Sequence, residues 1–179
     1  MRVPARPHTP AQLRYALIPS PIDELLLVAD EQGLCGVYMR EHKRGRDPEP
    51  DWARDEQGLA GVRTQLDQYF AGLRERFDVC VSLHGTPFQQ SVWAALAEIP
   101  FGETVSYSEI AQRIGRPRAV RAVGAANARN PISLILPCHR VVGAGARAAL
   151  TGYAGGLERK RWLLDHERRV GSAGAGAAG

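Results

Sequence analysis

Apolar and polar residues alternate over short stretches in the first half of the chain, a pattern that predicts strands. Two apolar runs, residues 25–28 and 34–38, are joined by a turn-forming cluster and predict a β-hairpin. Apolar residues then recur at helical spacing over residues 59–73 and alternate again over residues 77–83, which predicts a helix followed by a strand. The charged, proline-containing segment 41–54 predicts an exposed loop. This half therefore combines a small sheet with one helix.

Helix-start signals dominate the second half. Residues 86–89 have the form of a capping box with proline at the first helical position, and they predict a helix through residue 99. Residues 106–109 repeat the capping pattern and predict a short helix that ends near residue 115. A further helix is predicted over residues 118–130. Two short helices with a glycine-containing turn between them resemble a helix-turn-helix.

The pattern after these helices leads to a cysteine. The apolar run 132–136 delivers the chain to Pro137 and Cys138, and a glycine-rich loop over residues 143–156 precedes a final helix through His166. The low-complexity tail predicts disorder at the C-terminus. We therefore expect an α+β protein with an N-terminal α/β domain, a mostly helical domain and a disordered tail, over residues 1–85, 86–168 and 169–179 respectively.

Composition indicates a soluble protein. The chain has 179 residues, of which 44% are hydrophobic, as is ordinary for a globular domain. No run approaches the roughly 20 apolar residues that cross a membrane, and the N-terminus lacks the apolar segment of a secretory signal. Three cysteines at wide spacing predict free thiols rather than a disulfide framework or a paired-cysteine zinc site. We therefore expect a cytoplasmic protein.

Positive charge is concentrated in one segment. Residues 106–147 hold seven arginines against a single acid, Glu109, and are therefore +6, whereas the whole chain is +4. Such a cluster suits a polyanionic partner, although a solvated arginine-rich face is the commoner cause of the pattern. Charge alone leaves both interpretations open.

Cys138 is the candidate nucleophile. A cysteine reacts strongly only as a thiolate, so it needs a neighbouring base or positive charge, and His139 and Arg140 follow it directly. A cysteine after an apolar run is, however, more often a small buried hydrophobic residue than a catalyst. Adjacency to a histidine does not decide between these two roles.

Six short motifs lie around this cysteine: FQQSVW at 88–93, IPFGET at 99–104, RAVG at 121–124, NP at 130–131, PCHRVV at 137–142 and TGYAGG at 151–156. Together they resemble the bacterial O6-alkylguanine-DNA alkyltransferases, most specifically from Gly85 to Glu167. The resemblance implies a ribonuclease-H-like N-terminal domain with a small antiparallel sheet. It also implies a mostly helical C-terminal domain that contains a helix-turn-helix and the acceptor cysteine.

The same resemblance implies a mechanism. The Cys138 thiolate attacks the alkyl carbon on guanine O6, His139 acts through water as the general base, and Glu167 orients His139. Tyr107 matches the family's proton donor for the departing guanine. The product is a thioether without a good leaving group, so each molecule acts once. Implied substrates are O6-alkylguanine and O4-alkylthymine in duplex DNA, with no cofactor, and the protein acts as a monomer that is able to cluster on DNA.

The resemblance also assigns a DNA surface and a base pocket. An alkylated base must leave the stack, at a cost of a few kcal/mol, and Arg121 matches the arginine that fills the vacated space. The other residues of this minor-groove surface are Tyr107, Ala119, Ala122, Gly124, Ala125 and Arg129. Asn130 matches an asparagine that joins the recognition helix to the active site. The pocket residues are Val141, Tyr153, Ala154, Gly155 and Gly156.

The sequence departs from the family pattern at three places. Ala128 replaces a glycine, the segment 143–150 is about two residues longer, and Asp23 replaces the glycine of a Ser-Pro-Ile-Gly turn. We expect Asp23 to alter a turn without touching the chemistry. Some relatives bind structural zinc, but the matching neighbourhood offers Asp30 and Cys35, with His84 elsewhere, so no metal is predicted.

Two other functions stay open at this point. An alkyltransferase-like damage sensor would flip the base without reacting, but in such relatives the cysteine is replaced, and Cys138 is present here. A cysteine hydrolase is compatible with one cysteine and one histidine, but the chain has no nucleophile motif of those families, and the helix-turn-helix would be unexplained.

Overall fold

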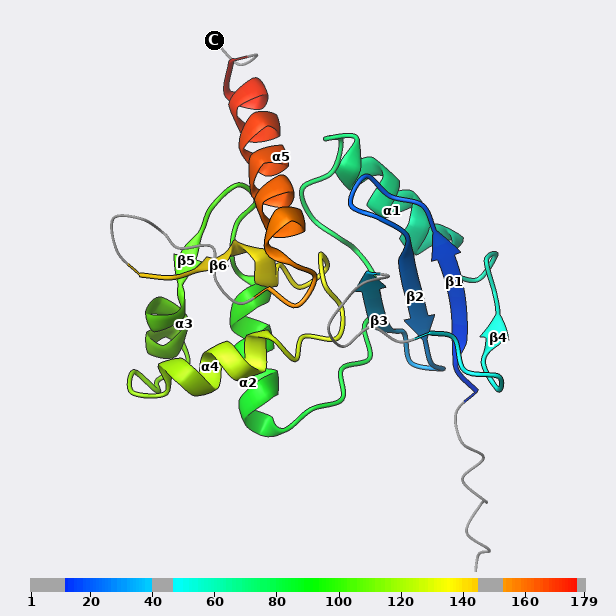
Figure 1. Ribbon diagram of the computed structural model, residues 1–179, viewed down its shortest axis with the longest axis horizontal. Helices are drawn as coiled ribbons and strands as arrows, with labels where there is room; N and C mark the ends of the chain where they lie inside the picture. The colour runs from blue at the N-terminus through cyan, green and yellow to red at the C-terminus, as the bar shows by residue number, and fades with distance from the viewer. Residues whose placement is uncertain (1–11, 40–46, 145–152, 177–179) are drawn as a thin grey trace, which may run out of the picture.

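A computed structural model describes residues 12–39, 47–144 and 153–176 of the chain. The α+β class is confirmed, because a four-stranded sheet with one helix is followed by a mostly helical part. Figure 1 shows the sheet on one side of the molecule and the short helices of the second part on the other. The longest helix, which ends at Gly176, lies between them.

The sheet consists of β1 (Arg14–Ile18), β2 (Leu25–Ala29), β3 (Leu34–Met39) and β4 (Ala53–Arg54), in the order β3-β2-β1-β4. The predicted hairpin is confirmed, because β2 and β3 pair antiparallel. β2 is buried along its whole length, with Leu27 in the main core and Val28 in a smaller cluster on the opposite face. That smaller cluster includes Trp52, which anchors the part of the predicted loop that becomes β4, paired in parallel with β1.

Helix α1 (Ala60–Phe70) lies where the apolar spacing predicts a helix, and it buries Leu66 and Tyr69. The strand predicted over residues 77–83 is wrong, since within this segment only Val81 forms a bridge, to Leu34. Phe77, Val79 and Leu83 do pack against the core, whereas Val81 is exposed. The alternation therefore reflects the one-sided packing of an extended linker rather than a strand in the sheet.

Helices α2 (Pro87–Ala97) and α3 (Tyr107–Arg113) begin at the two predicted capping boxes. The Thr86 side chain accepts a hydrogen bond from the Gln89 backbone, and the Gln89 side chain accepts one from the Thr86 backbone. Ser106 and Glu109 make the same reciprocal pair at α3. Both helix starts thus satisfy otherwise unpaired backbone N–H groups with residues three positions away.

Helix α4 (Val120–Asn127) follows α3 after a turn in which Gly115 has a φ of +68°. It packs against α2 and α3. Trp93 of α2 donates its Nε1–H to the carbonyl oxygen of Ala126 at 3.0 Å, which ties α4 to α2 through a buried contact. α4 is shorter than the predicted helix because the backbone turns at Ala128 and continues to Pro131.

The final elements surround the cysteine. A 3-10 turn, η1 (Cys138–Arg140), leads into β6 (Val141–Val142), which pairs in parallel with β5 (Val105–Ser106). Helix α5 (Leu157–Gly176) follows. The tail prediction is wrong for residues 169–176, which continue this helix, and residues 177–179 lie outside the described residues. Val170 packs closely over Gly72, a contact that supports the helix beyond its predicted end.

One hydrophobic core connects both parts of the molecule. Leu25 and Leu27 of the sheet belong to the same buried cluster as Trp93 of α2 and Leu163 of α5. Because the two parts share this cluster, residues of the N-terminal half are able to reach the surroundings of Cys138. None of the helices in the described residues is long and apolar enough to cross a membrane.

Candidate active site at Cys138

Asn130 sets the path of the chain into Cys138. Its side-chain NH2 donates to the carbonyl oxygen of Leu136 at 2.8 Å, and its side-chain oxygen accepts from the Ile132 backbone at 3.1 Å. The Cys138 N–H also donates to Leu136 at 2.8 Å. Leu134 lies between these contacts with a φ of +75°, a conformation that is rare for a residue with a Cβ. The predicted run 132–136 is thus a tight loop held by Asn130 rather than a continuous strand.

The Cys138 thiol is buried among polar partners. Burial raises its pKa, while hydrogen bonds from Asn130 and Ser133 and the positive charge of Lys160 act to lower the pKa. Lys160 is itself fully buried and donates from Nζ to the carbonyl oxygen of Val141 at 2.6 Å. Burial depresses the Lys160 pKa to about 8. The free protein therefore holds Cys138 mainly as a thiol, with a cation nearby that favours the thiolate.

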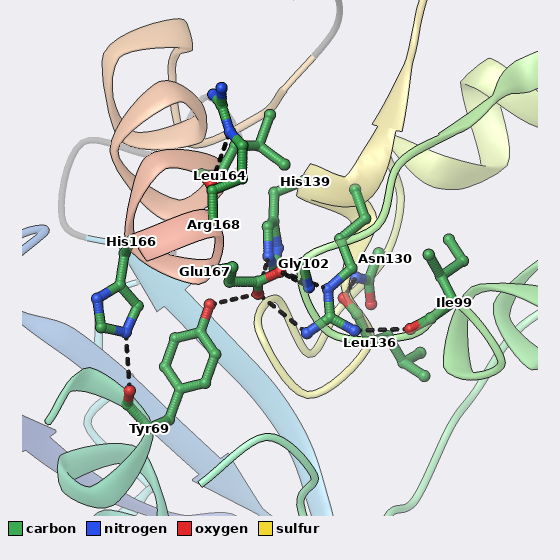
Figure 2. A network of polar contacts seen from close by, with 11 residues as sticks. Tyr69, Ile99, Gly102, Asn130, Leu136, His139, Leu164, His166, Glu167 and Arg168 are labelled. Carbon is green, nitrogen blue, oxygen red and sulfur yellow. Dashed lines mark hydrogen bonds and ion pairs between the residues drawn. The ribbon is translucent and has the colours of Figure 1, made fainter. Parts of the chain in front are cut away.

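His139 and Glu167 form a fully buried pair. His139 Nε2 lies 2.8 Å from Glu167 Oε1, and both side chains have no exposed surface. Figure 2 shows Tyr69, His139 and Gly102 directed at the Glu167 carboxylate. Burial by itself would raise the Glu167 pKa, but the hydrogen bonds and charges of His139 and Arg140 hold it well below its ordinary value. Glu167 is therefore an ionised acceptor at neutral pH.

The ionised Glu167 fixes the tautomer of His139. Because a carboxylate only accepts hydrogen bonds, His139 Nε2 carries the proton. Burial lowers the pKa of His139 despite the opposing effect of Glu167, so the ring is neutral and Nδ1 is basic. Nδ1 is buried and has no hydrogen-bond partner among the described residues. This arrangement leaves one basic nitrogen available to take a proton.

Arg140 is directed away from Cys138. Its Nε and Nη2 atoms each donate to Glu167 at 2.9 Å, and Nη1 donates to the carbonyl oxygen of Ile99 at 2.7 Å. The guanidinium also lies 5.5 Å from the centre of the Phe101 ring. The expectation that Arg140 activates the thiol or adds to the basic surface is therefore wrong. Its charge is buried and paired with Glu167.

Tyr69 is a site residue that the sequence pattern alone did not single out. It belongs to the apolar face of α1, and its hydroxyl donates to Glu167 Oε1 at 2.7 Å. Its backbone carbonyl oxygen accepts from His166 at 2.9 Å. Burial and the charge of Glu167 raise the Tyr69 pKa well above its ordinary value, so the hydroxyl stays protonated. The one available signal was a hydroxyl at a buried helical position, which needs a polar partner.

All five predicted pocket residues lie within the described ranges, whereas residues 145–152, including most of the longer 143–150 segment, lie outside them. Tyr153 is buried and interacts with both Ser133 and Cys138. Ala154 is half-buried, Gly155 is buried and Gly156 is exposed. Val141 is fully buried beside Lys160. Tyr153 thus interacts with Cys138, and Ser133 and Lys160 are further partners of the thiol that the sequence pattern did not identify.

The residues predicted to contact DNA lie on α3, α4 and their flanks. Four of them are exposed, namely Arg121, Ala122, Ala125 and Arg129. Three are half-buried, namely Tyr107, Ala119 and Gly124. A Cβ on Gly124 would lie 3.9 Å from the Tyr107 ring, so the start of α3 packs directly on α4. Of the arginines in the basic segment, residues 113, 116, 118, 121 and 129 are exposed, and residue 147 lies outside the described residues.

His84 lies closer to Asp30 than the sequence suggested. Asp30 Oδ2 accepts from the Ser82 hydroxyl at 2.6 Å and lies 3.2 Å from His84 Nε2. Cys35 and His84 line the same cavity as Asp30. Nevertheless, no group of three or more histidine, cysteine and acidic residues in the described ranges is arranged to hold a metal ion.

The site combines a buried thiol with a buried histidine–carboxylate pair. This arrangement is typical of proteins that react through a cysteine. Two family models match the chain, the 6-O-methylguanine DNA methyltransferase ribonuclease-like domain over residues 13–83 and the DNA binding domain of the same name over residues 87–169. The chain belongs to the methylated-DNA–protein-cysteine methyltransferase family.

Individual relatives match along nearly their whole length. The methylated-DNA–protein-cysteine methyltransferase of Methanosarcina acetivorans is 50% identical over 153 residues, 86% of this chain and 97% of that protein. The crystal structure of Mycobacterium tuberculosis O6-methylguanine methyltransferase is 48% identical in sequence and matches with a TM-score of 0.79. The match covers 88% of this chain and 94% of that one. A structure of M. tuberculosis OGT in complex with DNA matches with a TM-score of 0.80, over 88% of this chain and 94% of that one.

Proposed function

We propose that this protein repairs O6-alkylguanine in duplex DNA by moving the alkyl group irreversibly to the sulfur of Cys138. Membership of the family assigns the reaction class, which is DNA repair by alkyl transfer to a protein cysteine. The proposal adds the acceptor atom, the base and the order of events. The observation that carries it is the buried 2.8 Å contact between His139 and Glu167, which directs a basic His139 Nδ1 away from Glu167.

The first step removes the thiol proton. The Cys138 proton passes through a water molecule to His139 Nδ1, and the imidazolium that forms is stabilised by the Glu167 carboxylate. Lys160 favours the thiolate because its charge lies close to the sulfur. Burial disfavours the thiolate in the free protein, so a base that acts at the moment of reaction fits this site better than a permanently ionised cysteine.

The second step transfers the alkyl group. The sulfur forms a bond to the alkyl carbon while the bond from that carbon to guanine O6 breaks, and the electron pair stays with the guanine. The Tyr107 hydroxyl gives a proton to the departing base, which balances the proton taken by His139. O4-alkylthymine carries its alkyl group on an equivalent oxygen, so we propose it as a second substrate. The thioether on Cys138 has no good leaving group, and each protein molecule is consumed.

The base reaches Cys138 by leaving the duplex. We propose that α3 and α4 act as a helix-turn-helix in the minor groove, and that Arg121 occupies the space the nucleotide vacates. The exposed small residues Ala122 and Ala125 support close approach to a groove, and exposed Arg129 supports contact with phosphate. The protein acts on DNA as a monomer, because each chain carries the acceptor, base and DNA surface.

Mass spectrometry tests the acceptor. After incubation with a duplex that contains O6-methylguanine, the peptide with Cys138 should carry one methyl group per protein molecule. Cys35→Ser and Cys80→Ser are matched controls that should keep the transfer, whereas Cys138→Ser should abolish it. An unmodified Cys138 together with persistent, damage-specific binding would instead identify a damage sensor.

A further inference from the structure

The turn over residues 20–23 holds an aspartate where the backbone suits a glycine. Asp23 has a φ of +106°, which residues with a Cβ adopt rarely. Local contacts fix it there: Asp23 N–H donates to the Ser20 carbonyl oxygen at 3.2 Å, and the Ser20 hydroxyl donates to the carbonyl oxygen of Asp23. Asp23 Oδ1 accepts from the Glu24 backbone at 2.8 Å. The carboxylate is therefore oriented by its own turn.

Arg159 joins this turn to the loop that carries Tyr153. Its Nη2 donates to Asp23 Oδ2 at 2.8 Å, and its Nε donates to the carbonyl oxygen of Ile22 at 2.8 Å. Its Nη1 donates to the carbonyl oxygen of Gly155 at 2.9 Å. A planar guanidinium with three directed bonds holds its partners in one geometry. The turn of the N-terminal half is thereby fixed to residue 155.

Gly155 is packed tightly on its other side. A Cβ at this position would lie 2.3 Å from the Met39 sulfur and 2.8 Å from the Tyr153 ring. Tyr153 in turn donates to the Met39 sulfur at 3.9 Å and interacts with Cys138. A shift of Gly155 therefore reaches Tyr153, whose side chain interacts electrostatically with Cys138.

The opposite side of the same loop faces open space. A cavity of about 520 Å³ lies there, and its lining includes Ile22, Asp23, Gly155, Gly156 and Arg159 but neither Cys138 nor Tyr153. The loop thus has room to move outward from the thiol. The three bonds of Arg159 oppose that movement.

We propose that Arg159, oriented by Asp23, is a positioning residue that holds residues 153–156 against the Cys138 site and limits the size of the alkyl group accepted there. This rests on the proposed function, in which these residues form the wall of the alkylguanine pocket. A methyl group fits without moving the wall. A larger group needs the wall to shift into the neighbouring cavity, and that shift breaks the contacts of Arg159. On this proposal Asp23 makes no contact with the reacting groups and acts only through Arg159.

Two variants release the wall in different ways. Arg159→Ala removes all three bonds, and Asp23→Gly removes the carboxylate while placing a residue that suits the positive φ, so the turn keeps its backbone. Arg161→Ala is the matched control, since it removes the same charge from an exposed neighbouring position on α5. Rates of thioether formation at Cys138 are measured for all chains with duplexes that contain O6-methylguanine or O6-benzylguanine in the same sequence.

The ratio of the benzyl rate to the methyl rate should rise about tenfold in Arg159→Ala, a size typical of pocket-shape effects, and less in Asp23→Gly. It should not change in Arg161→Ala. An unchanged or lower ratio in both test variants overturns the proposal, and that includes a parallel loss of both reactions. Wild-type protein that gains no alkyl group on Cys138 from either duplex would instead overturn the proposed function.

Hydrogen exchange gives a readout that needs no reaction. The Gly156 N–H donates to the Tyr153 carbonyl oxygen at 3.1 Å. Its exchange should become faster in Arg159→Ala and in Asp23→Gly, and stay unchanged in Arg161→Ala. Unchanged exchange in both test variants would show that Arg159 does not hold this loop.

Discussion

The Tyr69 hydroxyl donates to Glu167 Oε1 at 2.7 Å, on the same oxygen that contacts His139 Nε2. A helix of the N-terminal half thus contributes directly to the hydrogen bonding of the candidate relay in the C-terminal half. Within the described residues the Tyr69 hydroxyl bonds to Glu167 and not to Cys138, so we assign Tyr69 a positioning role. Tyr69 also belongs to the one hydrophobic core that both halves share.

Replacing Tyr69 by phenylalanine should move the pH dependence of alkyl transfer. Without the hydroxyl, Glu167 holds the His139 proton more strongly, so the pKa of His139 rises and the base becomes protonated at higher pH. A hydrogen bond to a charged group is worth about 1.5–3 kcal/mol, and this energy is the upper bound on the increase in the activation free energy of alkyl transfer. The measurement is the rate with the free base O6-benzylguanine as a function of pH. Tyr15→Phe is the control, and an equal loss at every pH would mean that Tyr69 only supports the fold.

Lys160 should control the reactivity of the Cys138 thiol below about pH 8. Its ammonium lowers the pKa of the thiol, and it loses that charge as the pH rises through its own pKa of about 8. In Lys160→Met, alkylation of Cys138 by iodoacetamide should therefore be slower below this pH and approach the wild-type rate above it. Arg161→Met is the matched control. A constant ratio of the two rates across the whole pH range would contradict an electrostatic role.

Acid should destabilise the protein in two stages. Burial lowers the pKa of His139 below its ordinary 6.5, so the unfolded chain binds a proton there that the folded chain does not. The hydrogen bonds and charges of His139 and Arg140 hold the pKa of Glu167 below its ordinary 4.5. Below pH 4.5 the unfolded chain therefore also binds a proton at Glu167 that the folded chain does not. Each proton contributes about 1.4 kcal/mol per pH unit to the loss of stability.

Urea unfolding at a series of pH values measures this effect. The free energy of unfolding should start to fall below pH 6.5 and fall more steeply below pH 4.5. His139→Gln should flatten the upper stage, while His84→Gln, at a side chain that is 75% exposed, should leave it unchanged. Stability that stays constant between these two values would refute the assignment of a neutral buried His139.

Arg121→Ala should separate base extrusion from chemistry. If Arg121 fills the space left by the nucleotide, its loss slows repair of duplex O6-methylguanine by about tenfold or more, since flipping costs a few kcal/mol. Reaction with free O6-benzylguanine should stay near the wild-type rate, because that substrate needs no flipping. Arg113→Ala, which removes an exposed charge from α3, corrects for general loss of phosphate contacts. An equal loss on both substrates would place Arg121 in support of the pocket.

Local patterns were sufficient for several elements. The hairpin of β2 and β3 and the capped starts of α2 and α3 depend on residues within a few positions of one another, so turn and capping signals identify them. The motif that contains Cys138 and His139 was likewise visible along the chain, and the family comparisons agree with the resemblance read from it.

Only the tertiary structure decided which polar groups meet. Arg140 looks like an activator beside Cys138, yet its partners are the Ile99 carbonyl, 41 positions earlier, and Glu167, 27 positions later. In the sequence Tyr69 looks like one more apolar position of a helix. Its hydroxyl donates to Glu167, which lies 98 positions later, and no local pattern predicts that contact. The continuation of α5 past residue 168, where Val170 packs on Gly72, and the linker of residues 77–83 likewise involve packing partners distant in sequence. Periodicity reports which face of an element is buried, whereas the hydrogen-bond partners of a buried polar group depend on how distant segments pack around it.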